Sequence, residues 1–300
     1  SLAMLALLAL LWPAKSLGPA HTGRVASSLS LDWFYQFVHP LVDASSAATA
    51  WWLAAALTVA LAALPLLRNR RVRAPARVDL TNCNGCSRCA ADCPFAAVVM
   101  VARTDQSRDR LQALVRSDLC AACGICVGSC PSSTPFRRIE ELVSGIEMPD
   151  QPIAALRREL QQKLAALSGE QPIVLFTCGQ AADFSSLANA STAVMTLECA
   201  AMLPPSFLGY ALRMGAAGAL VVGCREGDCE FRLGDQWVRE RLSGVREPRL
   251  QASVPRDRTA VLWSGRDIAG IAATLATLRA RWSTVPRPQM NDPLKEAFHD

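Results

Sequence analysis

The chain has 300 residues, of which 51% are hydrophobic and 19% charged, and its formal net charge is +5. This length fits two or three domains, and the composition suits a chain that is partly globular and partly embedded in a membrane. Twelve cysteines are present, and eight of them lie between residues 83 and 130. Their spacing is typical of metal clusters, which argues against the disulfide framework of a small secreted protein.

The first 67 residues are predicted to be a membrane segment. The apolar run "SLAMLALLALLWP" has no basic flank, and we interpret residues 1–12 as the end of a transmembrane helix that starts upstream. Residues 47–67 carry no formal charge and suffice to cross a hydrocarbon core of about 30 Å as a helix, with Trp51 and Trp52 as interfacial aromatics. Residues 13–46 would form a loop on the outer side. A buried core helix at 47–67 is the alternative.

A basic flank, residues 68–77, follows this span. It contains five arginines and no acidic residue: Arg68, Arg70, Arg71, Arg73 and Arg77. By the positive-inside rule this end faces the cytoplasm, so we expect a protein of the cell inner membrane whose C-terminal domains are cytoplasmic. A nucleic-acid-binding patch is the rival interpretation, but a basic run beside a span is more often a topogenic flank or an anionic-lipid contact, and we expect no nucleic-acid partner.

The segment between the two apolar runs resembles the C-terminal half of cytochrome b near its outer quinol site. The matching residues are Pro19, Ala20, His21, Asp32, Trp33, Phe34 and Tyr35, and the match departs from that family at Leu31 and Asp32, where Pro and Glu are expected. The resemblance points to a membrane quinone or b-type cytochrome as partner. The chain itself has only His21, His39 and His299, none of them within residues 47–67, so the paired in-membrane histidines of a b-type haem are absent from this sequence.

Two copies of the pattern C-x2-C-x2-C-x3-C-P carry the strongest signal. They comprise Cys83, Cys86, Cys89 and Cys93 before Pro94, and Cys120, Cys123, Cys126 and Cys130 before Pro131. This run resembles the bacterial two-cluster ferredoxins over about residues 78–137, and we place an α+β ferredoxin domain at residues 78–140. Zinc is the alternative, but zinc ligands come in separated pairs.

The resemblance implies two [4Fe-4S] clusters, each held by three thiolates of one motif and the fourth of the other. We assign Cys83, Cys86, Cys89 and Cys130 to one cluster and call them the first cubane set. Cys93, Cys120, Cys123 and Cys126, the second cubane set, are assigned to the other. The charged residues 103–110, between the two motifs, are predicted to form a surface hairpin or turn.

A helical linker is predicted at residues 141–169. Apolar residues recur there every three or four positions, at Ile153, Leu156, Leu160, Leu164 and Leu167. This spacing indicates an amphipathic helix that packs on the next domain, or else binds a partner.

The last domain is predicted to be an α/β domain with a parallel sheet. Apolar, β-branched runs at residues 172–178, 192–199, 218–224 and 259–265 alternate with helical patterns. Ligands of such sheets gather beyond the carboxyl ends of the strands. Cys178, Cys199 and Cys224 stand at such ends and Cys229 follows Cys224, so we expect these four cysteines, here called the rim thiols, to form one site.

Residues 170–285 resemble the delta subunit of methyl-viologen-reducing hydrogenases, on the strength of "LECAAMLPPSF" and "LRMGAAGALVVGCREGDCEFRLGD". The resemblance implies electron exchange with heterodisulfide-reductase-type flavoproteins through a [2Fe-2S] cluster, for which the rim thiols supply four ligands. Members of that family often carry one more cysteine after the first strand, where this chain has only Cys178. Buried thiols acting as small hydrophobic side chains, or a zinc site, are the alternatives. Residues 286–300 are a tail.

The sequence therefore predicts a multi-domain protein with transmembrane α-helices, a two-cluster ferredoxin domain and a parallel-sheet α/β domain. It shows no Ser/His/Asp arrangement, and no catalytic residue is predicted. We expect a membrane-bound electron-transfer subunit that connects a cytoplasmic flavoprotein, hydrogenase or heterodisulfide-reductase-like enzyme with a quinone or b-type cytochrome. The alternative is a C-terminal docking module without a cluster, which tethers a soluble oxidoreductase to the membrane.

Overall fold

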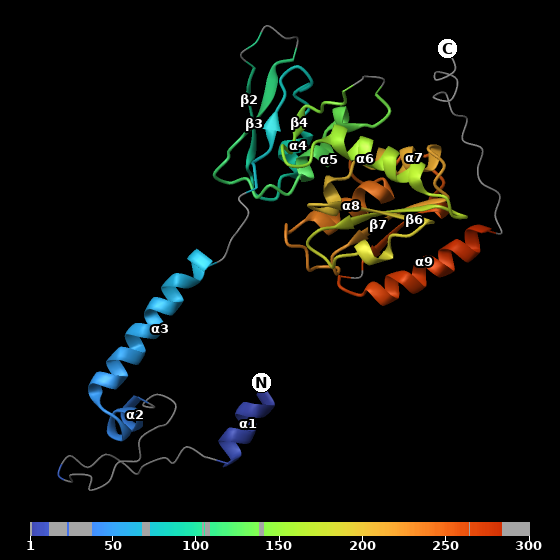
Figure 1. Ribbon diagram of the computed structural model, residues 1–300. Coiled ribbons are helices and arrows are strands. Elements are labelled where there is room, and N and C mark those ends of the chain that lie inside the picture. The colour runs from blue at the N-terminus through green and yellow to red at the C-terminus, as the bar shows by residue number, and fades with distance from the viewer. Residues whose placement is uncertain are drawn as a thin grey trace, which may run out of the picture. The chain divides into compact units, whose positions relative to one another are not determined.

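The computed structural model describes residues 2–11, 23, 38–67, 73–103, 105, 109–137, 141–263 and 265–283. They divide between two compact units, Ser1–Val72 and Arg73–Asp300, whose elements are labelled in Figure 1. The cytochrome b-like residues, the arginines at 68, 70 and 71, and the tail at 286–300 lie outside the described residues.

The first unit contains three helices in its described part: α1 (Leu2–Leu11), α2 (Val38–Ala44) and α3 (Ala47–Leu67). Among the described residues, α3 is the one helix long and apolar enough to cross a membrane, and its stretch Ala47–Leu64 has a mean hydropathy of 1.8 with no residue buried. A second span therefore stays a prediction. The predicted outer loop is corrected at its end, because Val38, Leu41 and Val42 have helical spacing and lie in α2.

The second unit begins with the predicted ferredoxin domain. Strand β2 (Val98–Ala102) pairs antiparallel with β3 (Leu111–Val115), which makes the charged segment between them the turn of a hairpin. Two short helices, α4 (Arg88–Asp92) and α5 (Ile125–Ser129), occupy corresponding places in the two cysteine motifs, and η1 (Pro131–Ser133) follows α5.

The ferredoxin domain extends beyond the predicted boundary at residue 140. Strand β1 (Arg77–Val78) pairs antiparallel with β4 (Ile146–Glu147), so the predicted basic flank ends inside a strand and the predicted linker contains its partner. The physical reason is that the backbone N–H and C=O groups of β1 need hydrogen-bond partners. A strand of two residues obtains them from a segment that is distant in the sequence, here β4. The helix of the linker, α6, runs from Ile153 to Ala166.

The C-terminal sheet has four parallel strands in the order β6-β5-β7-β8, as predicted for an α/β domain. The strands are β5 (Ile173–Cys178), β6 (Thr192–Leu197), β7 (Gly218–Gly223) and β8 (Thr259–Trp263), all within the predicted ranges. Its helices are α7 (Ser206–Arg213), α8 (Gly234–Ser243) and α9 (Ile268–Ser283), with single turns at η2 (Ser185–Leu187), η3 (Ala200–Met202) and η4 (Arg256–Arg258). Figure 1 shows α9 on one face of the sheet and α6, α7 and α8 on the other.

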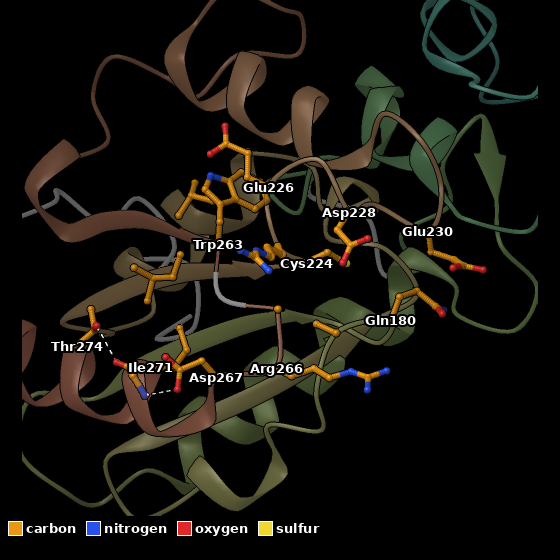
Figure 2. Close-up of a pocket in the computed structure, with 16 residues that line it drawn as sticks. Gln180, Cys224, Glu226, Asp228, Glu230, Trp263, Arg266, Asp267, Ile271 and Thr274 are labelled. Atoms are coloured by element: carbon orange, nitrogen blue, oxygen red, sulfur yellow. Dashed lines mark hydrogen bonds between the residues drawn. The ribbon is translucent and has the colours of Figure 1, made fainter. Parts of the chain in front are cut away.

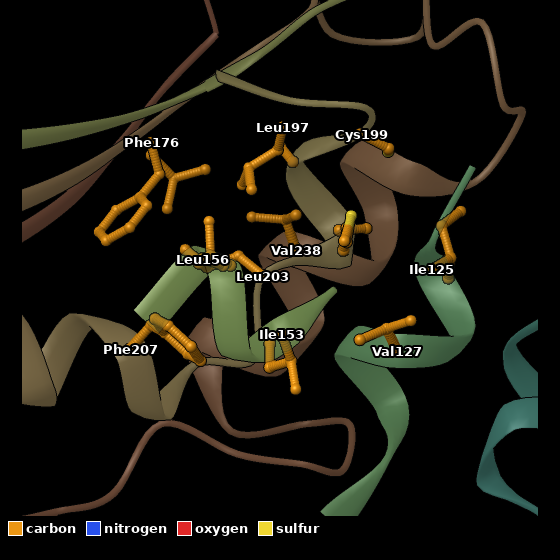
Figure 3. Packing of buried hydrophobic residues seen from close by; sticks show 14 of the residues in the cluster. Ile125, Val127, Ile153, Leu156, Phe176, Leu197, Cys199, Leu203, Phe207 and Val238 are labelled. Atoms are coloured by element: carbon orange, nitrogen blue, oxygen red, sulfur yellow. The ribbon is translucent and has the colours of Figure 1, made fainter. Parts of the chain in front are cut away.

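One hydrophobic core joins the sheet to the ferredoxin domain. Along β5 the side chains alternate, because Ile173 and Leu175 pack toward α9 whereas Val174 and Phe176 pack on the opposite face. The core on that opposite face continues through α6 and reaches Ile125 and other residues of α5 (Figure 3). The cysteine motifs and the strand ends are therefore held in one packed body.

Candidate iron-sulfur sites

The two cubane sets each surround a cavity of their own. The first cavity is lined by the first cubane set together with apolar residues such as Met100, Ala113 and Ile146. The second is lined by the second cubane set together with Ala76, Val98 and Met148. Each cavity thus receives three cysteines from one motif and the fourth from the other.

The local backbone explains this exchange. The residues that precede α4 and α5, Ser87 and Gly124, both adopt left-handed conformations with φ of 64° and 74°. Each left-handed turn brings three cysteines of one motif around one cavity. The fourth cysteine, Cys93 or Cys130, is the C-cap of the short helix and stands on the far side, where it lines the other cavity.

The electrostatics of these thiols suit a group that carries positive charge. Burial raises the pKa of Cys89 to about 12, with the neighbouring Cys130, Cys86 and Cys83 adding to the effect. Burial likewise raises the pKa of Cys123 to about 11, and it raises that of Cys126 well above its ordinary value. Four thiolates are therefore unfavourable in either cavity by themselves, whereas iron ions would offset their charge. The residues present fit [4Fe-4S] clusters in number, chemistry and burial.

The rim thiols stand at the carboxyl edge of the C-terminal sheet. Cys178 ends β5, Cys224 directly follows β7, and Cys199 lies two residues after β6. Because β5 and β7 are the central neighbours and the chain leaves them in opposite directions, they flank the topological switch point of the sheet. Ligands of open parallel sheets bind in the crevice at this point.

The structure brings the four rim thiols together in one row. The Cys224 thiol donates to Cys178 Sγ at 3.5 Å, and the Cys199 thiol is near enough to Cys178 and to Cys229 to lower the pKa of both. A Cβ placed on Gly234 would lie 2.6 Å from Cys199 Sγ and 2.9 Å from Cys229 Sγ, so the absence of a side chain there makes room for both sulfurs. In the described residues, no three His, Cys, Asp or Glu side chains surround a point as ligands of a single metal ion do.

Interactions among the rim thiols lower the pKa values of two of them and raise those of the other two. Those from Cys199 and Cys224 hold the pKa of Cys178 far below its ordinary value, and the interaction with Cys199 lowers the pKa of Cys229 to about 6. Sharing protons with these partners, and burial, raise the pKa values of Cys199 and Cys224. Backbone N–H groups add to the effect, since those of Gly234 and Asp235 at the start of α8 lower the pKa of Cys229. Such donors favour sulfur in its anionic form.

A cleft of about 990 Å³ opens beside the rim thiols (Figure 2). It lies beyond the carboxyl ends of β5, β7 and β8, and α9 forms one wall. Cys224 is among its lining residues, and so are side chains of both charges, including Arg225, Glu226, Asp228 and Arg266. Through Cys224, the one rim thiol among its lining residues, the cleft gives this site a polar approach from outside.

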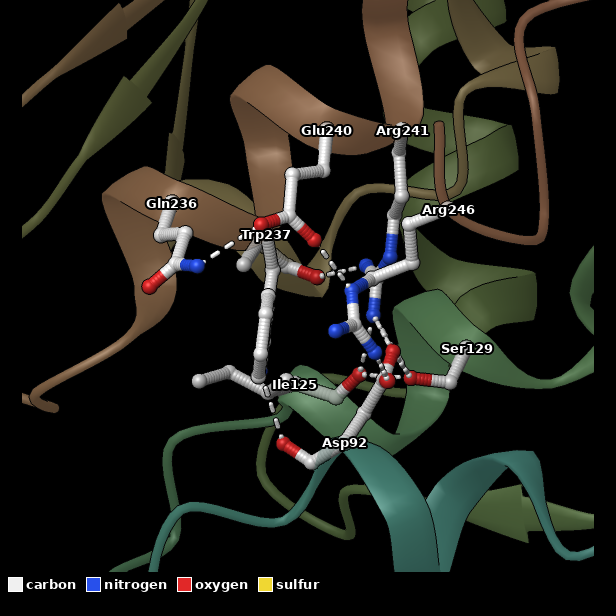
Figure 4. A network of polar contacts seen from close by, with 9 residues as sticks. Asp92, Ile125, Ser129, Gln236, Trp237, Glu240, Arg241 and Arg246 are labelled. Atoms are coloured by element: carbon white, nitrogen blue, oxygen red, sulfur yellow. Dashed lines mark hydrogen bonds and ion pairs between the residues drawn. The ribbon is translucent and has the colours of Figure 1, made fainter. Parts of the chain in front are cut away.

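The sequence did not reveal a buried polar network between the two domains (Figure 4). Asp92 forms ion pairs with Arg241 at 2.5 Å and with Arg246 at 2.6 Å, and Ser129 donates to Asp92 at 2.7 Å. The Asp92 and Arg241 side chains are 3% and 1% exposed. The sequence does show that Asp92 and Ser129 occupy the same position, directly before the last cysteine of each motif. It contains no pattern that identifies the distant arginines with which they pair.

Comparison with known families gives the class of each domain. Residues 82–134 match the model of the 4Fe-4S dicluster domain. The chain therefore contains an iron-sulfur ferredoxin domain, and [4Fe-4S] clusters bound by several of its cysteines are supported.

The second match is more particular. Residues 173–281 match the model of the methyl-viologen-reducing hydrogenase delta subunit. The chain thus joins a dicluster ferredoxin domain to a delta-subunit-like domain, as the sequence predicted. This combination suggests an electron-transfer subunit that associates with hydrogenase or heterodisulfide-reductase-like subunits.

Proposed function

We propose that this chain is a membrane-bound iron-sulfur subunit that relays electrons between a cytoplasmic oxidoreductase and a membrane quinone or b-type cytochrome. The oxidoreductase would be a hydrogenase or a heterodisulfide-reductase-like flavoprotein. The observation that carries the proposal is the meeting of the four rim thiols at the sheet edge, in a domain that shares its core with the two cubane sets.

The ligands would divide as follows. The first and second cubane sets would each hold one [4Fe-4S] cluster, and the rim thiols would hold a [2Fe-2S] cluster. When bound, such clusters take up and release single electrons without bond cleavage in the protein. The thiol row fits the smaller cluster, because its two end pairs, Cys178 with Cys224 and Cys199 with Cys229, can each serve one iron.

The polypeptide contributes insulation and hydrogen bonds. Buried apolar side chains such as Ile125 and Val127 exclude water from the neighbourhood of the cubane sets. The backbone N–H of Ala97 donates to Cys93 Sγ at 3.3 Å, and the backbone N–H groups of Gly234 and Asp235 lower the pKa of Cys229. Hydrogen bonds to sulfur and solvent exposure set the reduction potentials of such clusters.

The membrane part of the proposal rests on α3. Its 21 residues would extend about 32 Å at 1.5 Å per residue, close to the thickness of a hydrocarbon core. Large apolar side chains of this helix are exposed, among them Trp51 and Trp52 at 76% and 77%. An unburied apolar surface of this length is stable in lipid and unfavourable in water. The arginines that follow it support an inner-membrane location with cytoplasmic C-terminal domains.

Iron and acid-labile sulfide analysis of the anaerobically purified full chain tests the proposal. Two cubes and the smaller cluster give about ten irons per chain, whereas two cubes alone give about eight. The double variant Cys224→Ser, Cys229→Ser is expected to lose about two irons and keep both cubes. A wild-type chain with about eight irons, unchanged in the double variant, would contradict the [2Fe-2S] assignment.

The alternative is a clusterless docking module, in which the rim thiols are packing residues. It is favoured by the burial of Cys178 and Cys199, which are 2% and 1% exposed. In that case the full chain would still tether an oxidoreductase to the membrane. The iron count separates the two functions directly.

A further inference from the structure

The segment after Cys199 runs directly onto one of the two cubane sets. Cys199 is the N-cap of η3, and the last residue of that turn is Met202. A Cβ placed on Gly124 would lie 2.7 Å from both Cγ and Sδ of Met202, so Met202 fills the space beside Gly124. Gly124 lies between Cys123 and Cys126 and lines the cavity of the second cubane set.

The segment after Cys229 reaches the same cavity from another side. Arg232 donates from Nη1 to the backbone oxygen of Pro94 at 3.2 Å. Its guanidinium also lies over the Phe95 ring, 5.1 Å from the centroid. Pro94 and Phe95 follow Cys93 in the sequence, and both line the cavity of the second cubane set.

Helix α8 connects the rim thiols with the ferredoxin domain. Its first residue, Gly234, lies against the sulfurs of Cys199 and Cys229. One turn later the Trp237 indole N–H donates to the backbone oxygen of Asp92 at 3.0 Å. The next turn carries Arg241, which is buried in the same interface.

The Arg241 guanidinium contacts residues that are close in sequence to predicted ligands, and Figure 4 shows it pointing toward Asp92, Ser129 and Ile125. Nη1 donates to the backbone oxygen of Ala201, two residues after Cys199, at 2.7 Å. Nη2 donates to Asp92 Oδ2 at 2.5 Å, to Ser129 Oγ at 2.6 Å and to the Ile125 oxygen at 3.4 Å. Asp92 and Ile125 directly precede cysteines of the second cubane set, and Ser129 directly precedes Cys130 of the first. One side chain therefore fixes segments that bear ligands of both domains.

The cavity of the first cubane set is packed by its own domain. A Cβ on Gly85 would lie 2.4 Å from the Leu111 backbone oxygen, and one on Gly145 would lie 2.8 Å from that of Asn82. Gly85 and Gly145 line this cavity, and both of the segments that approach them belong to the ferredoxin domain.

From this asymmetry we propose that the cluster held by the second cubane set, rather than that of the first, would exchange electrons with the cluster held by the rim thiols, and that Arg241 is the positioning residue of this transfer. The inference rests on the proposed function and assigns an order to its centres. One electron leaves the reduced centre and enters the oxidised one, while no proton moves and no bond is broken. The electron comes from the flavoprotein partner, or from dithionite in the experiment. Because electron tunnelling slows steeply with distance, the closest packed pair of centres carries the transfer.

Magnetic relaxation tests the order of centres. In the full chain, purified anaerobically in detergent and reduced with dithionite, a nearby reduced cube accelerates the spin relaxation of the [2Fe-2S] signal. The variant Cys123→Ser should lose this acceleration, and the matched variant Cys86→Ser, which removes a ligand of the first cubane set, should keep it. The reverse pattern, or equal loss in both, overturns the inference.

Variants of Arg241 test the positioning role without removing a ligand. Arg241→Met should weaken the acceleration and lower the reduction potential of the second cubane set's cluster, because a positive charge near Cys126 is lost. Arg241→Lys keeps the positive charge but not the planar set of N–H donors. The reduction potential of the second cubane set's cluster should therefore return toward the wild-type value, while the acceleration of the [2Fe-2S] spin relaxation stays weak. Arg239→Met, on the same helix, should match the wild type in both measurements.

The two proposals fail in distinguishable ways. A chain without any [2Fe-2S] signal refutes the cluster at the rim thiols and, with it, this inference. A chain that shows the signal, but whose relaxation and potentials are the same in Arg241→Met and Arg239→Met, refutes the role of Arg241 alone.

Discussion

Replacing Arg241 by methionine should destabilise the second unit, chiefly because the buried Asp92 carboxylate loses one of its two ion-pair partners. The Asp92 carboxylate is 3% exposed and is paired with Arg241 and Arg246. Removing one partner of a buried ion pair typically costs about 3–5 kcal/mol, because the other charge remains buried. Arg246 is 27% exposed and still pairs with Asp92 in the variant. We therefore expect a loss at the lower end of that range, about 3 kcal/mol.

Thermal unfolding of the cluster-loaded full chain in detergent, at one fixed scan rate, measures this loss. In a domain of about 150–250 residues each kcal/mol shifts the midpoint by about 2–4 °C, so the expected decrease is about 6–12 °C. Arg239→Met is the matched control on the same helix. Its side chain is 49% exposed and pairs with Glu226, which is 63% exposed, so its effect should stay within about 0.5 kcal/mol.

A double variant identifies the cause of the loss. If the stranded Asp92 charge is responsible, adding Asp92→Asn to Arg241→Met should cost at least about 1 kcal/mol less than the sum of the two single variants. Strictly additive losses would refute the reasoning, because they would mean that Arg241 stabilises the unit through its own packing.

Three further predictions concern the ligands and the membrane. Cys93→Ser should damage the cluster of the second cubane set more than that of the first, as read from their EPR signals, and damage confined to the first would contradict the exchanged fourth ligand. Gly234→Ala should abolish the visible absorbance of the [2Fe-2S] cluster, because its methyl group would meet two rim-thiol sulfurs. Gly244→Ala, where φ is +89° but a Cβ meets nothing within 4 Å, should lower stability and yet preserve that absorbance. A reporter fused at Asp300 should be active in the cytoplasm, and activity restricted to the periplasm would overturn the proposed topology.

The features that sequence could predict are those with a local pattern. The four strands of the C-terminal sheet are short β-branched runs between turn residues, and each structural strand lies inside its predicted range. The convergence of three rim thiols followed from one rule, that the carboxyl ends of parallel strands share an edge. The position of Cys229 depended on the loop after β7, where Gly227 has a φ of +77° and its N–H donates to Asp235.

Features that depend on distant partners were not predictable from one sequence. Strand β4 has two residues, too few for any periodicity, and exists because β1 pairs with it. Arg241 contacts Asp92 across 149 positions of the chain, and on α8 it has the appearance of any arginine of an amphipathic helix. Helical spacing places Arg241 on the same face of α8 as Trp237 and Val238, whereas Arg239 lies on the exposed face, but this spacing does not reveal which distant acceptor Arg241 reaches.

The choice of a polar rather than an apolar contact at this junction has a structural consequence. Hydrophobic residues of similar volume are often as stabilising as a buried ion pair, or more so, and stability alone therefore does not explain Asp92 and Arg241. An apolar contact tolerates rotation and sliding, whereas each guanidinium N–H requires an acceptor in a fixed direction. Trp237 strengthens this constraint in two ways. The Arg246 guanidinium carbon lies 3.4 Å from the centroid of the Trp237 ring, and the indole N–H of Trp237 donates to the Asp92 backbone oxygen. The network thus fixes the orientation of the ferredoxin domain on the sheet edge, and this orientation sets the distance between the cubane sets and the rim thiols, the proposed redox sites.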